Sequence, residues 1–367
     1  MNRSIIGISD VSLGYGSTQI PLFIKYLKAK KEGYRAIVFE VDQPEKAYIR
    51  DRYPEFTIER VMTGVPCYTK AGRIEYIRKC TKIINKLKPE ILVLFCSFTL
   101  PVLFGIKYRP EKVIYYNIEM ASAYGKSDMV LNSMLSGKAD LLIYPESNRA
   151  MLDIRKFGPQ DIPAVEIYNC CDREAANGGN TSGEDCAEKN GKIIYSGTLD
   201  YENTNAGYLL DRELNQYKID IFGNVTGKDS EKLRQELISL NANVRYHGYI
   251  ANEELRRIKK QYAYSIVMWN PVNENQYFAA PNKFFESIAD SVIPIAAPHP
   301  QCRELINKYD CGILMRDWSL EAFKEALQVA KTVYGTRRYE EMTENCRRAV
   351  EEELSWEKQM EKLDQWI

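Results

Sequence analysis

Short apolar runs alternate with segments of helical periodicity along the first half of the chain. Mainly apolar runs occur at 5–8, 36–41, 91–95, 113–116 and 141–144, with Glu40 as the one charged residue among them. Residues 74–87 instead place Ile77, Ile84 and Leu87 at spacings that put them on one side of a helix. Continuous apolar strands are typical of a parallel sheet covered by helices on both faces. We therefore predict an α/β fold for this half, closed by an extended segment at 163–168.

The same alternation starts again at residue 192. Strands are predicted at 193–196, 219–222, 244–246, 264–269, 292–297 and 311–315, and helices at 228–240, 253–262 and 320–334. Between the two series, 172–190 lacks apolar periodicity and contains the glycine-rich stretch 178–183, as linkers do. We predict a first domain at 1–172, a linker at 173–191, a second domain at 192–350 and a C-terminal helix at 351–367.

Composition narrows the class of protein. A chain of 367 residues fits two domains of ordinary size. Its 50 Lys and Arg residues balance its 50 Asp and Glu residues, so no net charge attracts nucleic acid. Nine scattered cysteines without a C-x-x-C pair, and only two histidines, argue against a zinc site and for a reducing compartment. With no apolar run of about 18 residues, we expect a cytoplasmic protein.

Gly14-Tyr15-Gly16 follows the first predicted strand and is one candidate for a phosphate loop. A dinucleotide site needs a third glycine and an acidic residue at the end of the second strand. The third glycine is missing here, although Glu40 and Asp42 occupy the acidic position. A dehydrogenase is the weaker interpretation, and the other is a loop in which Gly16 lets the backbone approach a phosphate or an acceptor.

The stretch from Tyr277 to Glu304 carries the strongest candidate chemistry. Pro281 and Asn282 can begin a helix, which places Lys283 and Glu286 in one turn near its N-terminus. Free N–H groups and the helix dipole favour an anion there. A lysine can neutralise a phosphate, and a carboxylate one turn later can accept hydrogen bonds from sugar hydroxyls. The alternative is an ordinary amphipathic helix with a solvated Lys/Glu pair.

The segment Pro281-Asn-Lys-Phe-Phe-Glu-Ser-Ile-Ala-Asp-Ser-Val-Ile-Pro-Ile-Ala296 resembles the P-x-K-x-x-E-x-x-A-x-G-x-P-V-I-A motif of GT-B glycosyltransferases near family 4. Ser291 replaces the usual glycine, and Phe278 stands where the family often has a first glutamate. Weaker similarities occur at 137–147, 167–172, 244–255 and 354–357. The resemblance covers most of the chain and is firmest over 192–318.

This resemblance implies two Rossmann-like parallel-sheet domains facing across a cleft, with a C-terminal helix crossing back to the first domain. It also implies roles in binding a nucleotide sugar, with Lys283 on the diphosphate and Glu286 on ribose or sugar hydroxyls. The further candidates for the donor site are Gly16, Gly197, Thr198, Gly248, Tyr249, Ile250, Tyr277 and Asn282. A plain β-to-α turn at 197–198, core packing by Tyr249 and aromatic packing at Tyr277 are the alternatives.

Glu119 is the candidate catalytic base, because it follows the fourth strand, near where relatives of the family place a histidine at the cleft. Asp10, after the first strand, is the second choice. The alternative for Glu119 is a loop carboxylate without chemistry.

We expect a glycosyltransferase that moves a sugar from a UDP- or GDP-type donor to a glycan or lipid-linked acceptor, without a cofactor or metal. A nucleotide-sugar epimerase and a non-catalytic sugar-nucleotide-binding subunit are the alternatives. The lysines at 25, 28, 30 and 31 suggest peripheral contact with the inner face of the membrane, or else a solvated helix face.

Overall fold

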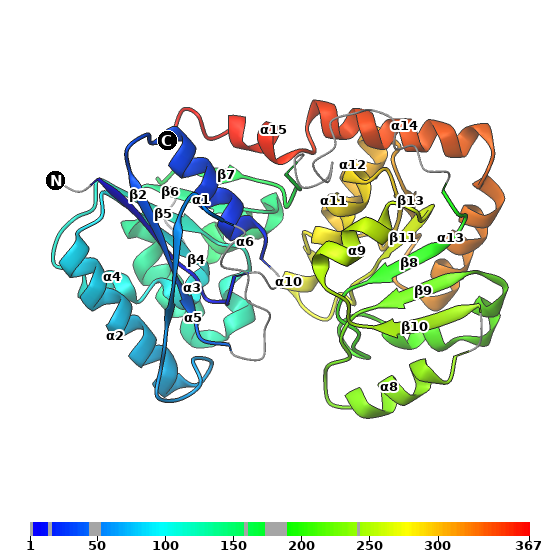
Figure 1. The fold of residues 1–367 in the computed structure, drawn as a ribbon, viewed down its shortest axis with the longest axis horizontal. Coiled ribbons are helices and arrows are strands. Elements are labelled where there is room, and N and C mark those ends of the chain that lie inside the picture. Colours follow the sequence, from blue (N-terminus) through cyan, green and yellow to red (C-terminus); the bar gives the residue numbers. More distant parts are fainter. Residues whose placement is uncertain (1–2, 14–16, 44–52, 158–160, 173–188, 241–242) are drawn as a thin grey trace. The chain divides into compact units, whose positions relative to one another are not determined.

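The structure is a computed structural model that describes residues 3–13, 17–43, 53–157, 161–172, 189–240 and 243–367. The chain divides into two compact units (Figure 1). Unit 1 contains Met1–Ile167 and Met360–Ile367, and unit 2 contains Tyr168–Gln359. Most of the predicted linker, 173–188, lies outside the described residues.

Unit 1 is built on a seven-stranded parallel sheet in the order β3-β2-β1-β4-β5-β6-β7. The strands are β1 (Ser4–Ile8), β2 (Arg35–Val41), β3 (Thr57–Val61), β4 (Ile91–Phe95), β5 (Lys112–Tyr116), β6 (Leu141–Tyr144) and β7 (Ala164–Glu166). Its helices are α1 (Gln19–Lys30), α2 (Lys70–Leu87), α3 (Cys96–Thr99), α4 (Val102–Gly105), α5 (Lys126–Leu135) and α6 (Ser147–Phe157), with short 3-10 helices η1 (Ala121–Tyr124) and η2 (Ser136–Lys138). The apolar runs are confirmed as strands.

In the sheet of unit 1, β2 and β3 lie on one side of β1, and the later strands from β4 onward lie on its other side. Strand β1 pairs with β2 on one side and with β4 on the other, with Ile5 opposite Ala36 and Ile91. In open parallel sheets, ligands bind outside the carboxyl ends of the strands at such a switch point. The loops that follow β1 and β4 are therefore the place to look for a site in this unit.

Unit 2 has a six-stranded parallel sheet in the order β10-β9-β8-β11-β12-β13, and its switch point lies between β8 and β11. The strands are β8 (Ile193–Ser196), β9 (Ile219–Phe222), β10 (Val244–Gly248), β11 (Tyr264–Val267), β12 (Ile293–Ala296) and β13 (Ile313–Leu314). The helices are η3 (Ala206–Leu210), η4 (Arg212–Gln216), α8 (Ser230–Ile238), α9 (Asn252–Lys259), α10 (Glu274–Tyr277), α11 (Asn282–Ala289), α12 (Pro300–Tyr309), α13 (Leu320–Val333) and α14 (Arg337–Glu352).

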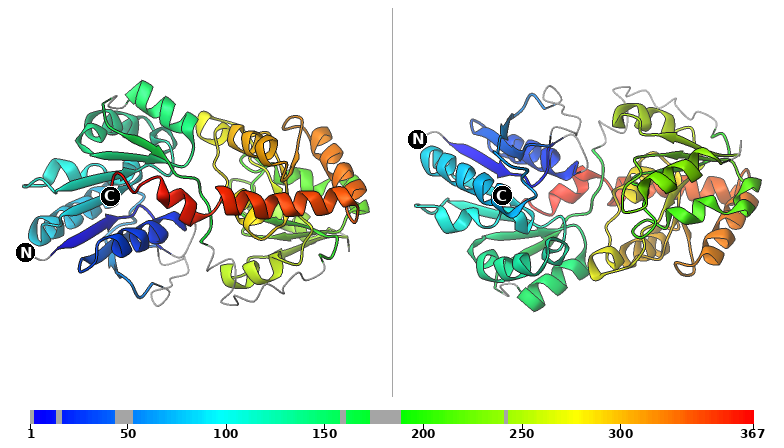
Figure 2. Two further views of the ribbon diagram at one scale, coloured as in Figure 1. Left: turned by 90° about the horizontal axis from the view of Figure 1, so that it is seen from above. Right: turned by 90° about the horizontal axis from the view of Figure 1, so that it is seen from below.

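Each unit has its own apolar core. In unit 1, Phe39, Leu92 and Tyr115 from the sheet pack with Tyr76 of α2. In unit 2, Phe284, Phe285 and Ile288 of α11 pack in a cluster that includes Cys346 of α14. Helix α14 runs along unit 2 in every view (Figures 1 and 2), in agreement with its contacts to α11 and α12.

The last residues of the chain return to unit 1. Helix α15 (Trp356–Glu361) begins in unit 2, and the segment from Met360 onward belongs to unit 1. The carboxylate of Asp364 lies 2.7 Å from the Lys30 ammonium and accepts a hydrogen bond of 3.1 Å from the Tyr26 hydroxyl. Of the predicted C-terminal segment 351–367, residues 351–359 belong to unit 2 and residues 360–367 to unit 1.

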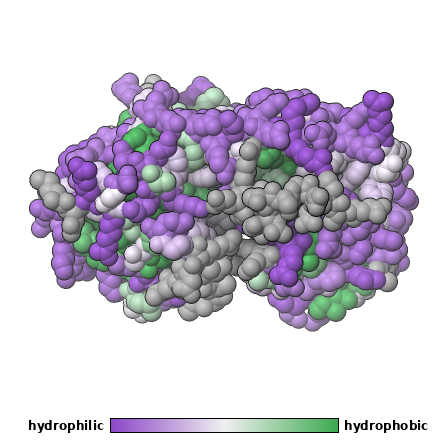
Figure 3. Space-filling model, turned by 45° about the horizontal axis from the view of Figure 1, so that its top comes forward, coloured by the Kyte–Doolittle hydropathy of each residue, from purple (hydrophilic) through white to green (hydrophobic). Residues whose placement is uncertain are grey.

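The described surface in Figure 3 is mainly hydrophilic, with hydrophobic residues in small separate groups. In the described part of the chain, no helix combines the length and the apolar character needed to cross a membrane. In the basic cluster of α1, Lys30 pairs with Asp364, and Lys25 lies 3.7 Å from Glu55. The cluster is therefore partly neutralised within unit 1.

Candidate functional site

Three glycines meet at the carboxyl edge of the unit 2 sheet. Gly197 follows β8, Gly223 follows β9, and Gly248 ends β10. The Gly197 N–H donates to the Phe222 carbonyl at 3.0 Å, and the Gly223 N–H donates to the Gly248 carbonyl at 2.9 Å. A Cβ on Gly223 would lie 1.7 Å from the Gly197 carbonyl oxygen. Only glycine at 223 allows this close approach, and sequence reasoning assigned that residue no role.

The loop after β8 is held in place by its own hydrogen bonds. The Tyr195 hydroxyl donates to the Thr198 carbonyl at 2.7 Å, and the Asp200 carboxylate accepts from the Asn203 N–H at 2.7 Å. At the end of β10, Tyr249 is 46% exposed, whereas Ile250 packs beside a buried cluster. Tyr249 therefore leaves its ring accessible rather than covering the core.

Helix α11 begins as its sequence predicts. Pro281 is the N-cap, Asn282 is the first helical residue, and Phe284 and Phe285 are buried beneath it. The Lys283 ammonium donates to both carboxylate oxygens of Glu286, at 3.1 and 2.9 Å. The two side chains share one face of the first turns, as their spacing indicates.

A third charged residue, Lys259 at the end of α9, joins this pair. Its ammonium lies 3.4 Å from the Oε2 atom of Glu286, and its side chain is only 1% exposed, against 29% for Lys283. Burial tends to raise the pKa of the Glu286 carboxyl, but Lys283 and Lys259 outweigh burial and lower this pKa to about 2. Burial also lowers the pKa of the Lys259 ammonium, an effect that Glu286 opposes.

The C-terminus of α11 explains the glycine in the resembling motif. Ser291 has a φ of 53°, in the left-handed region. Its N–H donates to the Ile288 carbonyl at 3.0 Å, and the Val292 N–H donates to the Ser287 carbonyl at 2.8 Å. These two bonds form a Schellman cap, whose left-handed position glycine occupies at the lowest cost. Ser291 therefore preserves the backbone path with a residue that is strained there.

Tyr277 lies at the end of α10 in an aromatic group. Its ring centroid is 5.6 Å from that of Trp318 and 4.8 Å from that of Phe278. Its carbonyl lies 3.2 Å from Nδ1 of the buried His299. Tyr277 remains 36% exposed, so its ring packs on one side and is open on the other.

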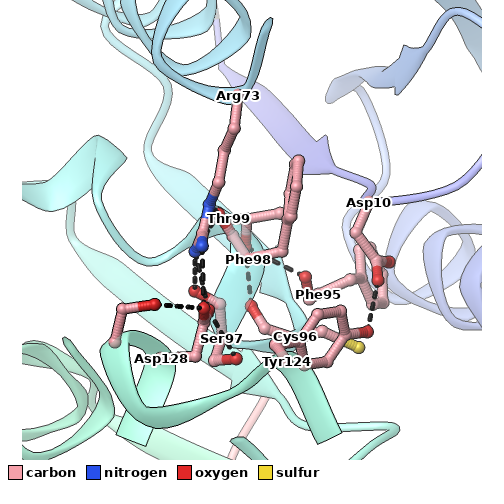
Figure 4. A network of polar contacts seen from close by, with 10 residues as sticks. Asp10, Arg73, Phe95, Cys96, Ser97, Phe98, Thr99, Tyr124 and Asp128 are labelled. Atoms are coloured by element: carbon pink, nitrogen blue, oxygen red, sulfur yellow. Dashed lines mark hydrogen bonds and ion pairs between the residues drawn. The ribbon is translucent and has the colours of Figure 1, made fainter. Parts of the chain in front are cut away.

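A second polar group lies at the switch point of unit 1 (Figure 4). The Tyr124 hydroxyl of η1 donates to Oδ2 of Asp10, after β1, at 2.5 Å. Cys96, after β4, is near both and adopts a φ of 60°. Burial raises the pKa of the Asp10 carboxyl, Glu119 raises it further, and the Tyr124 and Cys96 hydrogen bonds lower it. The carboxyl thus belongs to a partly buried cluster that lies outside adjacent strand ends.

An ion pair between Arg73 and Asp128 holds together the helices that surround this cluster (Figure 4). The Arg73 guanidinium donates to both Asp128 oxygens, at 2.8 and 2.7 Å, and its NH2 group also donates to the Phe98 carbonyl at 3.0 Å. The Ser97 hydroxyl donates to Asp128 at 3.1 Å. This network ties α2, α3 and α5 together and thereby holds Cys96 and Tyr124 in place.

Glu119 lies on the same edge in a different environment. Its Oε2 atom is 3.2 Å from a guanidinium nitrogen of Arg149, and its side chain is 44% exposed. Gly16 lies outside the described residues. Among the residues that are described, no three His, Cys, Asp or Glu side chains form a group able to hold a metal ion.

No protein-family model matches the sequence, and no curated protein matches it significantly. Solved structures do match the fold. Sucrose-phosphate synthase from Thermosynechococcus elongatus has a TM-score of 0.72 at 13% identity, over 99% of this chain and 98% of that chain. Anabaena HepE in complex with UDP-glucose has a TM-score of 0.73 at 15% identity, with the same coverage. WaaG, a glycosyltransferase involved in lipopolysaccharide biosynthesis, has a TM-score of 0.72 at 12% identity, over 98% of each chain.

These matches extend over nearly the whole of each chain, including both parallel sheets. They are consistent with the motif at 281–296 and with the return of the C-terminus to the first unit. The chain therefore has the GT-B fold.

Proposed function

We propose that this chain is a glycosyltransferase that moves a sugar from a nucleoside diphosphate donor to an acceptor hydroxyl. The observation that carries the proposal is the Lys283–Glu286 pair on the first turns of α11, within a GT-B fold. Anabaena HepE, which shares this fold, has been crystallised in complex with UDP-glucose. This supports a UDP-type donor, with GDP as the other nucleotide to test.

Lys283 would bind the diphosphate. During transfer, the acceptor oxygen forms a bond to the anomeric carbon while the bond from that carbon to the phosphate oxygen breaks, which leaves negative charge on the diphosphate. An ammonium and the free N–H groups of a helix N-terminus stabilise that charge. Glu286 would accept hydrogen bonds from ribose or sugar hydroxyls, and the backbone at Gly197, Thr198 and Gly248 would contact the nucleotide.

The acceptor hydroxyl must lose its proton, and two carboxylates of unit 1 can receive it. Asp10 is the better candidate, because its raised pKa favours proton uptake and Tyr124 orients its carboxylate. Glu119 is the second candidate, because its carboxylate is 44% exposed and is already paired with the Arg149 guanidinium at 3.2 Å. A glycan or lipid-linked acceptor, independence of metal ions and a cytoplasmic location at the inner face of the membrane are further parts of the proposal.

Incubation with a panel of nucleotide sugars tests the function directly. A transferase releases nucleoside diphosphate faster when an acceptor is present. An epimerase changes the sugar without releasing it, and a non-catalytic binding subunit does neither. Product analysis by mass spectrometry separates these outcomes, and absence of diphosphate release with every donor and acceptor would refute the proposal.

A further inference from the structure

We propose that Lys259 is a positioning residue that remains on Glu286 as its counter-ion when Lys283 leaves this carboxylate to bind the donor diphosphate. The inference rests on the proposed function. It assigns a role to a residue that has no counterpart in the P-x-K-x-x-E pattern and lies in a different helix.

The two lysines reach the same carboxylate oxygen from different surroundings. Oε2 of Glu286 lies 2.9 Å from the Lys283 ammonium and 3.4 Å from the Lys259 ammonium. Lys283 is 29% exposed and stands in the first turn of α11, whereas Lys259 is 1% exposed. Of these two, Lys283 is therefore the one that can turn toward a ligand.

Binding a diphosphate requires an exchange of partners. The Lys283 ammonium must give up part of its interaction with Glu286 to approach a phosphate. Glu286 is only 16% exposed, so water alone would compensate this loss poorly. A second cation that stays in place lowers the cost of the exchange, and Lys259 is placed to supply it.

The other charged groups around the pair do not replace Lys259. Arg256 of α9 lowers the pKa of the Glu286 carboxyl, but less than either lysine does. Asp290, at the C-cap of α11, and Cys171 also raise the pKa of the Lys259 ammonium, whereas Lys283 lowers it. The neighbouring Arg257 is exposed, so the burial of Lys259 is not a general property of this basic helix.

A double-mutant cycle on UDP binding tests this role. Lys259→Met removes the charge and keeps a similar shape, and Glu286→Gln removes the carboxylate that Lys259 is proposed to neutralise. Isothermal titration calorimetry with UDP and GDP would be carried out on the unsubstituted protein, both single variants and the double variant. Arg257→Met, on the exposed face of the same helix, is the matched control, and Lys259→Arg restores the charge.

We expect Lys259→Met to weaken UDP binding by about tenfold or more, because Glu286 then has no fixed counter-ion. In the Glu286→Gln background, the same substitution should change the affinity by less than about twofold. Lys259→Arg should recover most of the affinity, and Arg257→Met should leave it unchanged. This coupling separates positioning from packing, since a packing defect would weaken binding equally in both backgrounds.

Equal losses in the two backgrounds, or no loss on Lys259→Met, would overturn the inference and leave the proposed function standing. Failure of the unsubstituted protein to bind either nucleotide would overturn both. If Lys259→Met does not fold, Lys259→Gln is the second variant, because it keeps a hydrogen-bond donor without the charge. The same coupling to Glu286 is expected for it.

Discussion

Replacing Glu286 by glutamine should destabilise unit 2 by an amount that the structure allows us to estimate. The neighbouring ammoniums lower the pKa of this carboxyl from an ordinary value of 4.5 to about 2. At about 1.36 kcal/mol for each pH unit, this difference corresponds to about 3 kcal/mol at neutral pH. The loss of one partner of a buried ion pair falls in the same range, about 3–5 kcal/mol. We therefore expect Glu286→Gln to lower the free energy of unfolding by about 3 kcal/mol.

The pH dependence of this effect has a definite sign. Since the folded pKa lies below the unfolded one, the carboxylate stabilises the folded protein above pH 4.5, and this contribution is lost as the pH falls toward 2. Urea unfolding followed by tryptophan fluorescence measures the free energy of unfolding of the unsubstituted protein and of Glu286→Gln. The difference between these two free energies should be equal at pH 7 and pH 5 and should become smaller below pH 4.5.

The exposed Arg316–Glu325 pair provides the matched control. Its nitrogen and oxygen atoms lie 3.0 Å apart, but both side chains are more than half exposed. Glu325→Gln should therefore change the stability by less than about 1 kcal/mol. An equally small change for Glu286→Gln would refute the reasoning, because Glu286 would then behave like a surface carboxylate.

Two other predictions concern the cap of α11 and the base in unit 1. Ser291→Gly should raise the free energy of unfolding by about 1 kcal/mol, because it relieves the left-handed strain, whereas Ser133→Gly within α5 should lower it by about the same amount. Urea unfolding measures both changes, and a loss of stability in Ser291→Gly would contradict the cap. Asp10→Asn should abolish transfer and leave nucleotide affinity unchanged, whereas Glu119→Gln should retain most of the turnover. Loss of turnover in Glu119→Gln but not in Asp10→Asn would identify Glu119 as the base. Because the Asp10 pKa is raised, kcat/KM should fall on the acid side at a pH above the ordinary 3.8, and Tyr124→Phe should move that fall to higher pH by removing a hydrogen bond that lowers the pKa.

The strands could be predicted because buried parallel strands consist almost entirely of apolar residues, as in β4 and β6. Strand β3 was missed, because an edge strand with Glu59 and Arg60 has no continuous apolar run. Lys283 and Glu286 were found because their contact is local in the sequence. Lys259 was not, since nothing in its charge-rich helix marks one lysine as buried, and its contact with Glu286 joins residues 27 positions apart. The Asp10–Tyr124 bond joins residues 114 positions apart, which only the sheet order brings together.

The most direct test of the central claim is the affinity of UDP for the Lys283→Ala variant, measured by isothermal titration calorimetry beside the unsubstituted protein. Lys232→Ala, an exposed lysine of α8, controls for the general loss of a positive charge in unit 2. A charge-assisted bond to phosphate contributes about 1.5–3 kcal/mol, so Lys283→Ala should weaken binding by about tenfold to a hundredfold, while Lys232→Ala has no effect. UDP binding that is unchanged in Lys283→Ala would contradict the account.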